Sequence, residues 1–432
     1  MILFYLPTPS RLRHSSSHST LHRLLTPSAN MATPAMDTPA DTSSAATETF
    51  HVGTRRSLLA RVQTDQIVNA LKKQWPTYNF EIHAMATTAD NDLQTALYKF
   101  NEKSLWTAEL EVRLQQGGLD FIVHSLKDMP TQLPADCALG CVTARNDPRD
   151  ALVVKPTLAN SIRTLSDLPQ GAVVGTSSLR RVAQLKRHFP HLNFADVRGN
   201  IGTRLAKLDN PDGEYSAIVI AVAGLERLGL TDRITSHLSK DNGGMLHAVG
   251  QGGLGVEIRK DDERAKKLLA PIICERTMRA ALVERGLLRT LEGGCSVPIG
   301  VETTWLSKKT SLTSNAGTGV GVGIKPAEEY HHLTGVAQAP TNSQMGVATS
   351  TNAAARDDGS DGLTDELDVR AIVVSLDGKE AAETTMQRRI SSRDDAEEFG
   401  IEVARALVEK GAGKILEAIT LNRHIIEKQE GA

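Results

Sequence analysis

Apolar and polar positions alternate along most of the chain with two distinct periodicities. In the segment 57–74, apolar residues such as Leu59, Ile67 and Leu71 recur at spacings that place them on one face of a helix. Residues 80–84 instead alternate one by one between apolar and polar, as a half-buried strand does. Residues 121–123 form a short apolar run. Segments of the two kinds follow one another, which predicts parallel α/β sheets.

The same analysis of periodicity predicts further helices and strands toward the C-terminus. It predicts helices at residues 106–114, 179–188, 202–208, 275–291, 394–410 and 415–426, and strands at residues 151–154, 172–174, 194–197, 217–222, 296–305 and 369–376. Because ligands of parallel sheets gather at the carboxyl ends of the strands, the residues that follow each strand are the first candidates for a functional site.

Composition narrows the class of protein. At 432 residues the chain is long enough for two or three domains, and its formal charge of -2 at pH 7 argues against a nucleic-acid-binding protein. The apolar runs are shorter than the roughly 18 residues that predict a membrane span. Four cysteines in so long a chain are no disulfide framework, so we expect a reducing compartment. Cys137 and Cys141 have no second pair at zinc spacing, and we expect core residues there and no metal site.

The first 49 residues differ from the rest and are interpreted as a disordered leader outside the fold. Residues 1–30 carry Arg11, Arg13 and Arg23 and no acidic residue, which is a weak match to an organelle transit peptide. Because this match is weak, a leader without a targeting function is the preferred interpretation, and we expect a cytoplasmic protein. A mitochondrial location is the alternative if the leader is translated and acts as a transit peptide.

Basic residues follow five of the predicted strands. They are Arg55, Lys127, Arg180 with Arg181, Arg198 with Arg204, and Arg227. The turn at residues 175–178 also opens a predicted helix, where unpaired backbone N–H groups and hydroxyls favour an anion. Single arginines are usually solvated surface residues. Guanidinium groups at several strand ends of a nearly neutral chain nevertheless predict a cleft for a polyanion.

Asp128 is the one carboxylate in the motif that carries Lys127. A neighbouring cation keeps such a group ionised at neutral pH, so Asp128 is suited to stabilise a positive intermediate or to move a proton. A structural ion pair with Lys127 is the alternative interpretation.

Cys295 lies in a loop between the helix predicted at 275–291 and the strand at 296–305. Gly293 and Gly294 allow backbone angles closed to other residues, and Pro298 prevents a helix from continuing through the loop. The loop therefore suits a thiol that is presented to a ligand, although most cysteines are small buried core residues.

These segments also carry a resemblance to a known family. Residues 52–60 (VGTRRSLLA), 124–130 (HSLKDMP), 175–181 (GTSSLRR), 197–200 (VRGN), 250–252 (GQG) and 291–298 (LEGGCSVP) resemble motifs of porphobilinogen deaminase, in the same order. The similarity runs from about residue 50 to residue 301 and resumes weakly from residue 369. The chain is thus identified as a member of that family.

The resemblance implies an enzyme, a hydroxymethylbilane synthase of haem biosynthesis. One dipyrromethane cofactor would be held by Cys295 through a thioether. Four porphobilinogen molecules would be added to it head to tail with loss of ammonia, and hydrolysis would release hydroxymethylbilane. Asp128 would stabilise azafulvene cations and move protons at the pyrrole nitrogens. The resemblance implies no nucleic acid and no membrane partner, and we expect a monomer.

The family motifs also imply which residues bind the cofactor and the substrate. The cofactor would contact Ser125, Lys127, Asp128, Thr176, Ser177, Ser178, Arg180, Arg181, Gly199 and Arg204. The acetate and propionate groups of the substrate would contact Arg55, Ser57, Gln63, Lys99, Lys103, Arg198 and Arg227.

The family's architecture implies three domains. The first would span residues 50–146 and 250–270, the second 147–249, and the third 271–432; the first two resemble lobes of periplasmic binding proteins, and the third is a smaller α+β domain. The chain departs from the family at Ala89, at Gly253 and in an insert at about 306–363. The insert is rich in Ser, Thr, Gly, Ala and Asn, which predicts no fixed structure.

Two other classes of function fit parts of the sequence. A two-lobed anion-binding protein would fit the lobes but gives Cys295 no role. A phosphate- or nucleotide-using enzyme would fit the turn at 175–178, but the chain lacks the P-loop and dinucleotide-binding glycine patterns.

Overall fold

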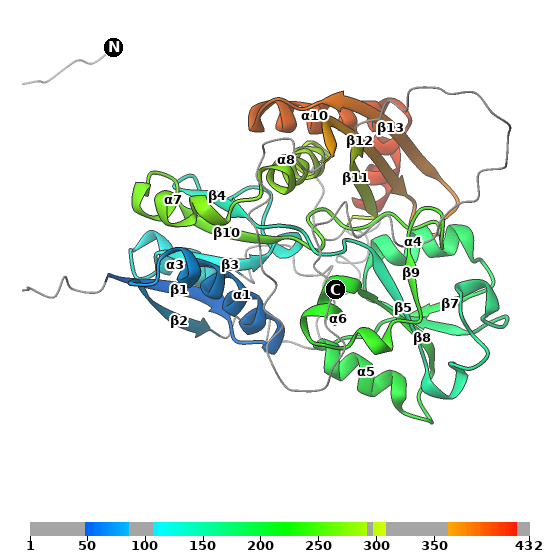
Figure 1. Ribbon diagram of the computed structural model, residues 1–432. Coiled ribbons are helices and arrows are strands. Elements are labelled where there is room, and N and C mark those ends of the chain that lie inside the picture. The colour runs from blue at the N-terminus through cyan, green and yellow to red at the C-terminus, as the bar shows by residue number, and fades with distance from the viewer. Residues whose placement is uncertain (1–47, 86–106, 292–296, 308–361, 421–432) are drawn as a thin grey trace, which may run out of the picture. The chain divides into compact units, whose positions relative to one another are not determined.

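Three β-sheets organise the computed structural model, which describes residues 48–85, 107–291, 297–307 and 362–420 (Figure 1). Within these residues, two sheets have five strands and one has three. Residues 1–47 of the expected leader and most of the expected insert lie outside the described residues, whereas Thr49, the last residue assigned to the leader, is the first residue of β1. None of the described helices is both long and apolar enough to cross a membrane.

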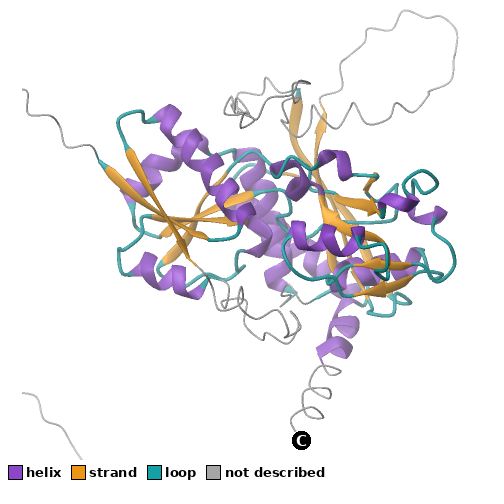
Figure 2. Cartoon of the chain, turned by 90° about the horizontal axis from the view of Figure 1, so that it is seen from below, coloured by secondary structure: helices purple, strands orange, loops and turns teal. Residues whose placement is uncertain are grey.

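The first sheet has the order β2-β1-β3-β10-β4. Its strands are β1 (Thr49–Arg55), β2 (Asn79–Met85), β3 (Phe121–Ser125), β4 (Cys137–Val142) and β10 (Leu254–Arg259). The helices α1 (Leu58–Gln74), α3 (Ala108–Gln115) and α7 (Glu263–Leu269) belong to the same part of the chain. Helices flank its strands on both sides (Figure 2).

Helix α1 begins where the sequence predicted it to begin. The side chain of Ser57 accepts a hydrogen bond from the backbone N–H of Ala60 and so caps the helix. Ile67 and Leu71 are fully buried with Phe50 and Phe121 in one core cluster, as the helical spacing predicted. Cys141 is buried in the same cluster, which confirms it as a core residue.

The second sheet has the order β7-β6-β8-β5-β9. Its strands are β5 (Asp150–Val154), β6 (Val173–Gly175), β7 (Asn193–Ala195), β8 (Tyr215–Ala221) and β9 (Ser236–Leu238). Helices α4 (Leu179–His188), α5 (Ile201–Asp209) and α6 (Val222–Arg227) follow β6, β7 and β8 in turn. Helix α4 has the bounds that the sequence predicted.

The prediction that the sheets are parallel was wrong for part of each sheet. Strand β10 is antiparallel to β3 and β4, and β5 is antiparallel to β8 and β9. Both strands enter their sheet directly after the chain has crossed from the other sheet, at residues 143–149 and 239–253. Apolar periodicity reports burial and carries no information on strand direction, so the sequence pattern missed the reversal.

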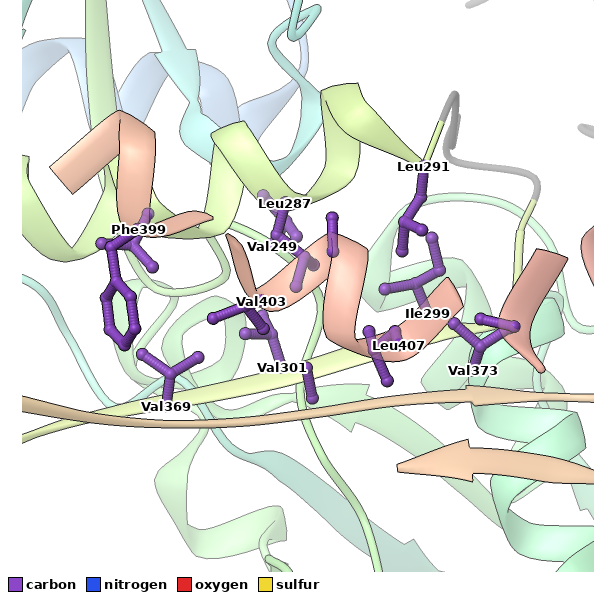
Figure 3. Packing of buried hydrophobic residues seen from close by; sticks show 14 of the residues in the cluster. Val249, Leu287, Leu291, Ile299, Val301, Val369, Val373, Phe399, Val403 and Leu407 are labelled. Atoms are coloured by element: carbon purple, nitrogen blue, oxygen red, sulfur yellow. The ribbon is translucent and has the colours of Figure 1, made fainter. Parts of the chain in front are cut away.

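The third sheet is antiparallel, with the order β11-β12-β13. Its strands are β11 (Ile299–Ser307), β12 (Leu363–Val374) and β13 (Ala381–Arg389). Helices α8 (Glu275–Thr290) and α10 (Arg393–Glu409) pack on it, and residues 412–420 are also helical. Leu287 of α8, Val403 and Leu407 of α10 and Ile299 of β11 meet in its core (Figure 3).

Strand β12 begins six residues before the strand predicted at residue 369. Ser307 at the end of β11 pairs with Leu363 at the start of β12, so the two ends of the insert are neighbours in the sheet. The division into domains at residues 146/147, 249/250 and 270/271 stays a prediction.

A buried carboxylate links the two crossover segments to the third sheet. Glu284 of α8 is fully buried and accepts two hydrogen bonds from Arg145, with distances of 2.5 and 3.0 Å. It also accepts hydrogen bonds from the backbone N–H of Gly250 at 2.7 Å and from Oγ1 of Thr303 at 2.7 Å. Burial alone would raise the pKa of Glu284, but Arg145 and these hydrogen bonds hold the pKa below its usual value.

We predict that Arg145→Ala destabilises the protein by about 3–5 kcal/mol, because it leaves the Glu284 carboxylate buried without its counter-charge. Urea unfolding measured by circular dichroism tests this. Lys266→Ala is the matched control, since Lys266 pairs with Glu263 on an exposed surface, and it should leave the unfolding midpoint unchanged. Equal midpoints for the two variants would contradict the role given to Glu284.

Candidate active site

A pocket of about 70 Å³ opens at the carboxyl ends of β1 and β3. Its lining residues are Arg55, Ser57, Leu59, Ala60, Gln63, Thr107, Val123, His124, Ser125 and Asp128. Strand β1 ends at Arg55 and β3 ends at Ser125, so the pocket lies where the rule for parallel strands places ligands. Five of the residues predicted from the sequence meet here: Arg55, Ser57, Gln63, Ser125 and Asp128.

Asp128 ends a single 3₁₀ turn, Leu126–Asp128, that directly follows β3. Leu126 is buried beneath this turn, whereas Asp128 is exposed and faces the pocket. Ser125 donates a hydrogen bond of 2.9 Å from its hydroxyl to Oε1 of Gln63 on α1, which ties the two walls of the pocket together. The turn thus presents one carboxylate on a rigid support.

Lys127 connects this turn electrostatically with the second sheet. Burial is the main cause that lowers its pKa, and the positive charges of Arg181 and Arg180 lower it further. The carboxylates of Asp128 and Asp150 act in the opposite direction. Groups from both five-stranded sheets therefore share one electrostatic environment.

The turn predicted to seat an anion lies between β6 and α4. Ser178 caps α4 by accepting a hydrogen bond from the backbone N–H of Arg181, and Thr176 is buried. The hydroxyl of Ser177 donates to the backbone oxygen of Val197 at 2.9 Å. Residues 176–178 thus provide hydroxyls and the amino end of a ten-residue helix at the carboxyl end of β6.

Arg180 and Arg181 are held by one carboxylate at the start of β5. Nη1 of Arg180 donates to Oδ2 of Asp150 at 2.8 Å, and Nη2 of Arg181 donates to Oδ1 at 2.7 Å. Backbone oxygens of Leu246 and Val219 accept further hydrogen bonds from the two guanidinium groups. Both arginines are only 5% exposed, so they are fixed and nearly buried rather than free in a solvated cleft.

The same carboxylate is also bound by the crossover segment. Nε2 of Gln251 donates to Oδ1 of Asp150 at 2.9 Å. Burial by itself would raise the pKa of Asp150, but Arg180, Arg181 and Gln251 hold this pKa well below its usual range. Asp150 is therefore ionised at neutral pH and neutralises part of the arginine charge.

Arg204 in the first turns of α5 is hydrogen-bonded to the backbone of Gly199, which precedes the helix. Gly199 has a φ of +104°, and a Cβ there would lie 2.7 Å from Cγ2 of Thr203, so only glycine fits. Its backbone oxygen accepts a hydrogen bond of 2.8 Å from Nε of Arg204. Burial, together with the charge of Arg181, lowers the pKa of Arg204 to about 10. Arg198 lies beside Asp196, with 3.1 Å between Nε and Oδ2.

Arg227, the last residue of α6, is hydrogen-bonded to both segments that cross between the five-stranded sheets. Its Nη2 donates to Oδ1 of Asn146 at 2.9 Å and to the backbone oxygen of Gly252 at 2.7 Å. These contacts join the two crossover segments, and Arg227 is not among the residues that line the pocket. Burial lowers its pKa to about 10.

Cys295, Lys99 and Lys103 lie outside the described residues. Leu291 and Ile299, on either side of the segment that carries Cys295, are buried in the core of the third sheet (Figure 3). Helix α8 ends at Thr290 and β11 begins at Ile299, and most of the loop expected between them lies outside the described residues.

Sequence reasoning missed a buried pair at the back of the pocket. Nε2 of His124 lies 2.8 Å from Oε2 of Glu257 on β10, and both side chains are at most 5% exposed. The charges of Glu257 and His124 also act on Glu111 of α3. Burial raises the pKa of Glu111, and the hydrogen bond from Thr107 opposes this change. A glutamate inside the apolar strand at residues 254–258 was the available signal.

Comparisons with known proteins point to one family. A family model described as the porphobilinogen deaminase, dipyromethane cofactor binding domain matches residues 50–267, and the model of the porphobilinogen deaminase C-terminal domain matches residues 278–321. Porphobilinogen deaminase from Neurospora crassa is 42% identical over 380 residues, covering 87% of this chain and 95% of that protein. The enzyme from Synechococcus elongatus is 50% identical over 264 residues, covering 61% and 81%.

Solved structures of other proteins are more distant. A nutrient-binding protein from Burkholderia cenocepacia bound to methionine aligns with a TM-score of 0.32 at 15% identity, covering 51% of this chain and 89% of that one.

We predict that Asp150→Asn destabilises the protein most at neutral pH. The folded-state pKa of Asp150 lies below its ordinary value of 3.8, so its stabilising effect is complete above that value and is lost as the pH falls through the lower folded-state pKa. The melting temperatures of wild type and variant should therefore differ most at pH 7 and converge below about pH 4. Asp212→Asn, at an exposed position, serves as the control. A difference that stays constant with pH would contradict the ion pair.

Proposed function

Because the chain belongs to the porphobilinogen deaminase family, we propose that Asp128 and the basic groups around it form the active site and that Cys295 carries the cofactor. The protein is a transferase of haem biosynthesis. It condenses four porphobilinogen molecules head to tail on a dipyrromethane cofactor, with loss of ammonia at each addition, and releases hydroxymethylbilane by hydrolysis.

The donor groups of the described residues fit a dipyrromethane. Each pyrrole of such a cofactor carries an acetate and a propionate, so it needs several cationic or hydroxyl partners. The charge of Arg181 contributes to lowering the pKa of both Lys127 and Arg204, and the hydroxyls of residues 176–178 lie at the end of β6 beside Arg181. When bound, the cofactor supplies the pyrrole ring to which the first substrate molecule is joined.

The observation that carries the assignment of Asp128 is its place as an exposed carboxylate in a pocket edged by cations. Burial lowers the pKa of both Lys127 and Arg204, and the negative charge of Asp128 opposes that change in each, so Asp128 lies within electrostatic reach of both. Loss of ammonia from porphobilinogen leaves positive charge on the pyrrole, and a fixed carboxylate stabilises charge that develops in this way. Asp128 is also placed to accept a proton from the ring.

The basic residues take two different roles in this proposal. Arg55, Arg198 and Arg204 bind carboxylates of the substrate and the growing chain. Arg180 and Arg181 supply preorganised positive charge, since Asp150 already fixes their guanidinium groups. Arg227 supports the crossover segments and acts on the substrate only through them.

We also propose that the enzyme works as a monomer in the cytoplasm. Cys137, Cys141 and Cys274 are free and buried, which suits a reducing compartment.

We predict that Asp128→Asn lowers turnover by about 100-fold or more while the fold and the bound cofactor remain, because the change removes a preorganised charge and keeps the size of the side chain. Initial rates of hydroxymethylbilane formation by the cofactor-loaded variant measure the effect. Asp136→Asn, which changes an exposed carboxylate away from the pocket, should retain the wild-type rate. Near-normal turnover of the Asp128 variant would reduce this residue to an ion-pair partner.

We predict that the purified enzyme is heavier than its sequence by one dipyrromethane and that the added mass lies on the peptide that contains Cys295. Intact-protein and peptide mass spectrometry measure both quantities. Cys295→Ser should lack the adduct, whereas Cys274→Ser should carry it, since Cys274 is buried in the fold. An unmodified Cys295 in active enzyme would exclude the covalent attachment.

We predict that Arg204→Leu slows an elongation step and accumulates enzyme that bears an intermediate number of pyrroles. A charge-assisted hydrogen bond contributes roughly 1.5–3 kcal/mol, so its loss slows a step without unfolding the protein. Native mass spectrometry resolves the enzyme–intermediate complexes. Arg233→Leu is the control, because Arg233 pairs with Asp209 outside the pocket. An unchanged distribution of complexes for Arg204→Leu would contradict its role as a carboxylate ligand.

A further inference from the structure

Two imidazoles and a carboxylate that the proposed reaction does not use lie together on the outer strands of the first sheet. His51 belongs to β1, and Glu81 and His83 belong to β2, which is an edge strand of the sheet. In the parallel register of the two strands, His51 pairs with Glu81, and His83 is two residues farther along β2. Because side chains two residues apart project from the same face of a strand, all three groups share one face of the sheet.

The donor atoms of the three side chains are already close together. Nδ1 of His51 lies 3.0 Å from Nε2 of His83, 3.6 Å separate it from Oε2 of Glu81, and 3.8 Å separate Nε2 of His83 from Oε1 of Glu81. Neighbouring ligands of a tetrahedral zinc ion with bonds of 2.0–2.1 Å are about 3.3 Å apart. The two imidazoles approach different oxygens of Glu81, and one donor atom from each residue lies within 4.8 Å of the other two, so small side-chain adjustments reach the spacing that such an ion requires.

The strands hold this arrangement for identifiable reasons. The register partner of His83 on β1 is Gly53, and a Cβ there would lie 2.6 Å from Cδ1 of Leu119, so glycine at this position lets Leu119 pack against the strand. His51 is fixed from the other side, because its backbone N–H donates to Oδ2 of Asp120 at 2.7 Å and its backbone oxygen accepts from the N–H of Asp120 at 2.8 Å. The site is thus built on paired strands and not on loop conformation.

Solvent can reach the open side of the cluster. The side chains of His51, Glu81 and His83 are 41%, 59% and 24% exposed, respectively. An ion held by these three groups would keep at least one position for water, as sites with three protein ligands do. Two neutral imidazoles and one carboxylate suit divalent ions of the zinc type, including cobalt and nickel, better than calcium or magnesium.

We propose that His51, Glu81 and His83 bind one divalent transition-metal ion, which links the edge strand β2 to β1. Arg55, at the pocket, is four residues farther along β1 than His51, which corresponds to about 13 Å of strand. The ion therefore stabilises the outer part of the first sheet and takes no part in the condensation. This inference stands independently of the roles assigned to Asp128 and Cys295.

The described residues offer no second group of this kind. Within that part of the chain, this is the only set of three His, Cys, Asp or Glu residues whose donor atoms lie so near one another. His331 and His332 lie outside the described residues, so the experiment must separate them from the strand site.

The test is a titration of the full-length, cofactor-loaded enzyme with Co²⁺ after treatment with a chelator. Visible absorption of Co²⁺ reports its coordination by nitrogen and oxygen, and competition with Zn²⁺ then gives the zinc affinity. We expect one equivalent of Co²⁺ to bind and Zn²⁺ to raise the melting temperature of the wild type. Absence of a saturable Co²⁺ signal at one equivalent would overturn the proposal.

Variants assign the ion to its ligands. His51→Ala and His83→Ala should each weaken binding by at least about tenfold, since even residues that only orient a ligand cost 10–100-fold when they are removed. Glu81→Gln changes an exposed side chain and keeps the strands intact, so weaker Co²⁺ binding in this variant cannot be ascribed to misfolding. All three variants should retain the wild-type rate of condensation and lose the Zn²⁺-dependent rise in melting temperature.

Two controls complete the experiment. His191→Ala, on the second sheet's part of the chain, and the double variant His331→Ala/His332→Ala should bind Co²⁺ as the wild type does. Loss of the signal in the double variant, or its persistence in His51→Ala, His83→Ala and Glu81→Gln, would place the ion elsewhere and overturn the proposal.

Discussion

The buried carboxylate of Asp150 is the group on which the active region of the second sheet depends. Two guanidinium groups and the amide of Gln251 converge on its two oxygens. None of these charges would be tolerated alone at this depth, because an unpaired buried ion loses its hydration without compensation. Together they keep two positive charges at the amino end of α4, beside the hydroxyls of residues 176–178, in fixed positions before any ligand arrives.

The reversal of β5 is part of the same arrangement. Asp150 is the first residue of β5, and this strand runs antiparallel to β8 between β8 and β9. The start of β5 is therefore level with the carboxyl end of β8, where Ala221 pairs with Asp150. A parallel β5 would put its first residue at the opposite edge of the sheet, far from α4. The crossover that reverses the strand thus also brings the carboxylate to the arginines.

Glu284 plays a comparable role where the crossover segments meet α8. Arg145, Gly250 and Thr303 come from three separate parts of the chain and all donate to its oxygens. Helix α8, which precedes the segment that carries Cys295, is consequently tied to both crossover segments. In the pocket, by contrast, Asp128 is exposed and near Lys127 and Arg204, so its charge remains available to a substrate. The buried carboxylates thus hold the cations in place, whereas the carboxylate of Asp128 is exposed in the pocket.

The sequence alone was sufficient for most helices and strands and for five of the residues that line the pocket, because local periodicity and short motifs carry that information. Helix α4 has its predicted bounds, and Arg55, Ser57 and Asp128 meet as their positions at strand ends predicted. The direction of β5 and β10, the contacts of Arg227 and the pairs formed by His124 and by Asp150 depended on the tertiary structure. The close approach of His51 to His83, which are 32 residues apart in the chain, also depended on the tertiary structure. Each of these features joins groups that are distant in the chain. Strand order and register decide which distant groups meet, and a local pattern of apolar and polar residues carries no information on either.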